Sequence, residues 1–70
     1  MKFQKGSLVT VKKGLIIGVK YGRGYYTSEL NTFVGKKMKV IAYDHGDNTY
    51  LLDKTGFWVA EEMLEQTSEN

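Results

Sequence analysis

Apolar and polar residues alternate in four short stretches of this chain, and this alternation predicts β-strands. The strands are expected over residues 8–12, 37–44, 48–53 and 57–59, because successive side chains of a strand point to opposite faces. One face then supplies the predicted core, which consists of Val9, Val11, Met38, Val40, Ala42, Tyr50, Leu52, Phe57, Val59 and Leu64. Clusters of Asp, Asn, Gly and Thr at residues 44–48 and 54–56 predict tight turns between antiparallel strands.

The connection between the first two of these strands is too long for a plain loop in so small a domain. Within it, Leu30, Phe33 and Val34 recur at helical spacing. Thr27 or Ser28 is placed to cap the start of a short helix, and a glycine at position 35 is placed to end it. Residues 60–64 predict one further helical turn, and residues 65–67 a last short strand.

This order of elements resembles the SH3-like small barrel, and residues 6–11, 35–40 and 58–64 carry the resemblance. More narrowly, residues 13–65 resemble a family of small uncharacterised proteins of phages and prophages in Gram-positive bacteria. The likeness lies in Gly-Val-Lys-Tyr-Gly at 18–22, Gly-Lys-Lys at 35–37 and the Gly-Phe-Trp and Glu-Glu-Met-Leu-Glu near the end. The expected fold class is therefore mainly β: a small SH3-like antiparallel barrel with a long first loop containing a short helix. It would form a single domain over residues 1–65, with a frayed tail over residues 66–70.

Net charge, cysteine content and the length of the apolar runs limit which partners and which cellular compartment are expected. The chain has 70 residues, no cysteine and a net charge of +2 from ten Lys/Arg against eight Asp/Glu, an excess too small to be typical of a dedicated nucleic-acid binder. Its longest apolar run, residues 15–17, is far too short to span a bilayer. We therefore expect a cytoplasmic protein, in the host cell if phage-encoded, with no membrane partner and no disulfides.

The densest binding chemistry lies in residues 18–28, which we call the Gly/Tyr segment. Glycines allow sharp turns and close approach of a ligand, tyrosines offer flat rings, and arginine offers a planar fork of donors. The candidate residues that bind a ligand or partner are Lys20, Tyr21, Gly22, Arg23, Gly24, Tyr25, Tyr26, Thr27 and Ser28. The segment also leads into the predicted helix, whose N-terminus would favour an anion. Alternatively, the loop tyrosines cover the second face of a thin sheet and complete the core.

A second candidate interface lies on the outward face of the strands. Ile41, Tyr43, Leu51 and Trp58 would form an apolar patch there, and such a patch usually marks an interface. Self-association as a homo-oligomer is one way to cover it.

Catalysis is not expected, and the sequence suggests neither a cofactor nor a metal site. The single histidine, His45, lies in a predicted turn, and the chain lacks a cysteine nucleophile, a Gly-x-Ser-x-Gly motif and a phosphate-binding loop. Gly22 and Gly24 lack the third glycine of a dinucleotide fingerprint.

The sequence thus predicts a non-catalytic binding module. If the phage resemblance holds, the implied role is counter-defence, either by sequestering a nucleotide immune signal or by blocking a host protein. Two alternatives remain open. One is a nucleic-acid-binding barrel that uses Lys36, Lys37 and Lys39 beside Tyr43, and the other is a generic intracellular protein-interaction adaptor.

Overall fold

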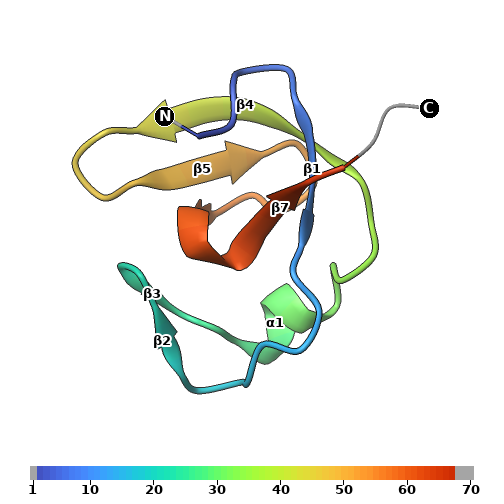
Figure 1. Ribbon diagram of the computed structural model, residues 1–70, viewed down its shortest axis with the longest axis vertical. Coiled ribbons are helices and arrows are strands. Elements are labelled where there is room, and N and C mark those ends of the chain that lie inside the picture. The colour runs from blue at the N-terminus through green and yellow to red at the C-terminus, as the bar shows by residue number, and fades with distance from the viewer. Residues whose placement is uncertain (1, 68–70) are drawn as a thin grey trace.

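Five antiparallel strands form the main sheet, in the order β6-β5-β4-β1-β7 (Figure 1). The computed structural model describes residues 2–67. The strands are β1 (Leu8–Val11), β4 (Met38–Asp44), β5 (Thr49–Leu52), β6 (Trp58–Ala60) and β7 (Leu64–Gln66). A 3-10 turn, η1 (Glu61–Met63), carries the chain from β6 at one edge of the sheet to β7 at the other. The fold is thus mainly β, as expected. The sheet is open between β6 and β7, so it is not the closed barrel that the sequence predicts.

Each strand predicted from alternation is present and ends within one residue of its predicted bounds. Eight predicted core residues are buried, whereas Ala42 and Phe57 are only half-buried. The alternation did not point to several further core residues, because they lie outside the predicted strands. These are Phe3, Tyr26, Leu30, Ala60 and Met63.

A β-bulge in β4 changes which face its last residues occupy. Val40 lies opposite Leu52, but the next pair is Ala42 with Leu51, so Ile41 is the extra residue. Directly opposed residues share a face of the sheet. Tyr43, opposite Tyr50, therefore turns toward the core, where the two rings pack with centroids 4.7 Å apart. This corrects the prediction that Tyr43 lies on the outer face with Ile41.

The long connection between β1 and β4 contains regular structure of its own. β2 (Lys20–Tyr21) and β3 (Gly24–Tyr25) pair as a separate hairpin, which lies below the main sheet in Figure 1. The helix α1 (Ser28–Asn31) follows, capped by Thr27, whose Oγ1 accepts the Leu30 N–H at 3.2 Å. It ends at Asn31, four residues before Gly35, and so is shorter than predicted.

Both ends of the described chain are tied to the sheet. At the N-terminal end, Phe3 is buried against Tyr50, and the Tyr50 hydroxyl accepts the N–H groups of Lys2 and Phe3 at 3.0 and 3.1 Å. At the other end, Gln66 lies in β7 and the Thr67 N–H donates to the Leu8 carbonyl at 3.1 Å. Two residues of the predicted tail, Gln66 and Thr67, thus bond to the sheet, and residues 68–70 lie outside the described part.

Candidate functional site

The Gly/Tyr segment folds as a hairpin whose tip is formed by two of the predicted site residues. Lys20 pairs with Tyr25 and Tyr21 with Gly24, so Gly22 and Arg23 form the turn between β2 and β3. Gly22 has φ of +62°, a left-handed conformation that favours glycine. Backbone bonds from Gly18 N–H to Tyr26 O at 2.8 Å and from Tyr26 N–H to Val19 O at 2.9 Å extend the pairing beyond the two strands.

The three tyrosines of this segment have different environments. Tyr26 is 1% exposed, its hydroxyl donates to Asn31 Oδ1 at 2.9 Å, and burial raises its pKa. Tyr21 is half-buried against the core, with its ring edge-on to Tyr26, and its hydroxyl accepts the Ile16 N–H at 3.0 Å. Tyr25 is 62% exposed. Tyr26 therefore does not offer the exposed ring that we expected, and of the three only Tyr25 presents a largely free ring.

The hydroxyl residues that follow have a structural role. Thr27 uses its side chain to cap α1, and Ser28 is the first residue of that helix. Because α1 has only four residues, its aligned peptide dipoles sum to little, and the anion site expected at its N-terminus has no substantial helix behind it.

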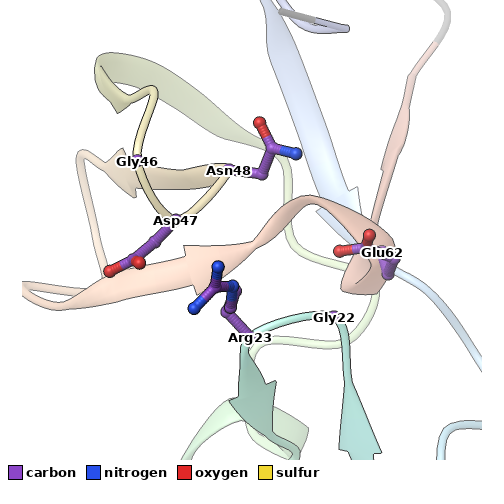
Figure 2. A pocket seen from close by; sticks show the side chains of 6 residues that line it. All are labelled: Gly22, Arg23, Gly46, Asp47, Asn48 and Glu62. Carbon is purple, nitrogen blue, oxygen red and sulfur yellow. The ribbon is translucent and has the colours of Figure 1, made fainter.

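The tip of the hairpin meets two other parts of the chain at an open cleft of about 300 Å³. We call it the turn cleft, and its lining residues are Gly22, Arg23, Gly46, Asp47, Asn48 and Glu62. Figure 2 shows these residues on the β2–β3 turn, the β4–β5 turn and η1, with the Arg23 guanidinium extending into the space between the other two and the Asn48 side chain pointing away from it. All six residues are exposed to solvent.

Local interactions fix the walls of the turn cleft. In the β4–β5 turn, Asp44 Oδ1 accepts the Gly46 N–H at 2.9 Å, and Asn48 adopts φ of +55° and accepts a hydrogen bond from the Tyr43 hydroxyl. The Glu62 carboxylate lies against the backbone of Gly22, in the space that a Cβ at that position would occupy. The glycine therefore allows the hairpin and η1 to approach each other.

The turn cleft carries both signs of charge on exposed groups. Arg23 contributes a guanidinium, Asp47 and Glu62 contribute carboxylates, and Asn48 a carboxamide. Of these, only Arg23 was among the predicted site residues. The sequence predicts only a tight turn at residues 44–48 and a helical turn at residues 60–64, and nothing in it indicates that the two lie beside Arg23.

The second candidate interface is only partly present. Ile41 and Trp58 are 41% and 47% exposed, and Trp58 lies opposite a half-buried Leu51 across β5 and β6. Tyr43 faces the core and does not belong to this surface.

The lysines near β4 lack Tyr43, the aromatic neighbour that the nucleic-acid alternative assigns to them. Lys36, Lys37 and Lys39 are exposed, but Tyr43 packs on Tyr50, and Lys36 lies 5.7 Å from the ring centroid of Phe33. His45 is exposed in the β4–β5 turn, edge-on to Tyr43. Over residues 2–67, no three His, Asp or Glu side chains converge as a metal site.

Comparison with known proteins does not add to this geometry: no family model, curated protein or solved structure matches the chain. Within the described residues, no helix has the length and apolar character needed to cross a membrane.

Proposed function

We propose that this chain is a non-catalytic binding module that recognises another protein through the turn cleft. The observation that carries the proposal is the convergence of Arg23, Asp47 and Glu62 from three separate elements at one open cleft. Exposed Tyr25 lies two residues from Arg23 and adds a rigid amphipathic ring of the kind enriched at protein interfaces.

The charges favour a polypeptide over a nucleotide. A phosphate group would gain from Arg23 but would be repelled by the carboxylates of Asp47 and Glu62. A protein surface carries both signs of charge together with amide donors and acceptors, so it can complement all three groups at once. Sequestration of a nucleotide immune signal is the competing proposal, and Arg23 beside Tyr25 is the feature that supports it.

The solvation of the site supports a binding role over a catalytic one. The lining side chains of the turn cleft are all exposed, whereas catalytic groups usually act in sites from which water is excluded. Exposed groups of opposite charge instead steer association and select the partner.

The identity of the partner depends on whether the chain belongs with the SH3-like phage proteins that its sequence resembles. The strand order with a 3-10 turn between the edge strands supports an SH3-like architecture. If the phage resemblance holds, the partner is a host protein in the cytoplasm and the module acts in counter-defence by blocking it. Otherwise the same cleft serves an intracellular adaptor.

Affinity capture with charge-reversed variants tests the proposal. Tagged wild-type protein, Arg23→Glu and Glu62→Lys would be incubated with a Gram-positive bacterial extract, with Lys37→Glu and Glu65→Lys as matched controls away from the cleft. We expect a protein retained by wild type and both controls and lost with both cleft variants. Equal capture by all five proteins would contradict the proposal. A nucleotide released by heating the wild-type protein, with no such protein retained, would favour the competing one.

A further inference from the structure

A turn at one end of the β2–β3 hairpin exposes an unusual number of aliphatic side chains. We call residues 16–19 the Ile turn. Ile16, Ile17 and Val19 are 63%, 53% and 41% exposed, and consecutive exposed aliphatic residues are costly in water unless they serve a contact. In Figure 1 the connection from β1 into β2, which contains this turn, reaches the lower end of the molecule's longest axis.

The geometry of the Ile turn is held by hydrogen bonds. The Val19 N–H donates to the Ile16 carbonyl at 3.1 Å, which closes the turn. The Ile16 N–H donates to the Tyr21 hydroxyl at 3.0 Å, and Tyr21 itself is packed against the core. The two isoleucines are therefore presented outward by an ordered backbone.

Only positive charge lies near the Ile turn in the sequence. Lys13 and Lys20 flank the turn and are both exposed. The first acidic residue of the chain is Glu29, and six cationic residues precede it: Lys2, Lys5, Lys12, Lys13, Lys20 and Arg23. An aliphatic turn flanked in the sequence by two exposed lysines is complementary to a surface that is apolar beneath an anionic layer.

We propose that the Ile turn binds peripherally to an anionic lipid bilayer. Ile16 and Ile17 would enter the boundary between headgroups and acyl chains, while Lys13 and Lys20 contact anionic headgroups. The prediction of no membrane partner rested on the lack of a spanning run, and a surface contact needs no such run. This site is separate from the turn cleft, because Gly22 and Arg23 form the opposite end of the hairpin from the Ile turn.

Other occupants fit the residues less well. Isoleucine offers a nucleic acid neither a ring for stacking nor a hydrogen bond. Two copies joined symmetrically at this turn would bring the lysines of both copies together, which like-charge repulsion opposes. Binding to a soluble acidic protein remains as an outcome of the test.

Co-sedimentation with vesicles provides the test, using the purified full chain. The vesicles would contain phosphatidylcholine alone or with about 30% phosphatidylserine at low ionic strength. The variants are Ile16→Ser with Ile17→Ser, and Lys13→Glu with Lys20→Glu. Their matched controls are Ile41→Ser, a similarly exposed isoleucine on β4, and Lys37→Glu with Lys54→Glu. Far-UV circular dichroism would establish that each variant is folded.

We expect wild type and both controls to sediment with the anionic vesicles, weakly and with loss at high salt. Each variant of the Ile turn should bind at least tenfold more weakly, and neutral vesicles should retain little of any protein. Two results would overturn the proposal: wild-type protein that stays in the supernatant with anionic vesicles, or binding that is unaffected by Ile16→Ser with Ile17→Ser. The same loss of binding to soluble polyglutamate on removing the isoleucines would point to an acidic protein instead.

Discussion

Two adjacent tyrosines of the hairpin, Tyr25 and Tyr26, should differ sharply in how much their replacement by alanine lowers the free energy of unfolding. Tyr26 is 1% exposed and Tyr25 is 62% exposed. Replacing a buried aromatic residue by alanine usually costs about 3–5 kcal/mol through lost burial and a residual cavity. Substitution of an exposed residue away from special features usually changes the free energy of unfolding by less than about 0.5 kcal/mol. Tyr26→Ala should therefore be strongly destabilising, and Tyr25→Ala nearly neutral.

Urea unfolding followed by far-UV circular dichroism would measure both variants. A domain of this size has a free energy of unfolding on the order of 3–10 kcal/mol, so Tyr26→Ala could leave no folded protein to titrate. Tyr26→Phe keeps the ring and loses only the hydrogen bond to Asn31, which should cost about 0.5–1.5 kcal/mol. The reasoning fails if Tyr25→Ala is as destabilising as Tyr26→Ala, or if both Tyr26 variants unfold at the wild-type urea concentration.

Further predictions concern the core, the α1 cap, the Gly22 turn and the pH dependence of stability. Val40→Ala, at a fully buried position, should lower the free energy of unfolding by about 1–3 kcal/mol in the same assay. Thr27→Ala should cost about 1 kcal/mol through loss of the α1 cap, and Thr27→Ser should restore most of it. Gly22→Ala should cost about 1–2 kcal/mol because its φ is +62°, and it should displace Glu62 from the cleft, with weaker partner binding as the readout. The Tyr50 hydroxyl, which donates to Glu61, lowers the pKa of that carboxyl below its ordinary 4.5. The stability from this contact should be complete above about pH 4.5 and be lost as pH falls through the folded-state pKa, and Tyr50→Phe should flatten that acid limb of the stability curve.

Periodicity was sufficient to place the strands, because the buried face of each one leaves a period of two in the sequence. It failed at the β4 bulge, where the extra residue Ile41 shifts Ala42 to the outer face and Tyr43 to the inner one. Val40, Ile41 and Ala42 are all apolar or small, so the alternation has no polar residue there to reveal the shift.

Only part of the binding site could be predicted from the sequence, because local composition indicates exposed turns but not packing between distant segments. Arg23 and Tyr25 are exposed in a local turn, which the glycines around them indicate. Burial of Tyr26 depends on packing with residues distant in the sequence, which local composition does not encode. Nor does local composition show that Asp47 and Glu62 line one cleft with Arg23, because that arrangement depends on how the hairpin sits against the β4–β5 turn and η1.

Site-specific photo-crosslinking tests most directly the claim that the turn cleft recognises a protein. A photoreactive phenylalanine analogue would replace Tyr25, an exposed residue two positions from Arg23, or Lys54, an exposed control position in the β5–β6 turn. After irradiation in a bacterial extract, the Tyr25 position should give a discrete protein adduct that the Lys54 position does not give, and Glu62→Lys in the same chain should abolish it. An adduct equally strong from both positions, or one that survives Glu62→Lys, would contradict recognition through the turn cleft.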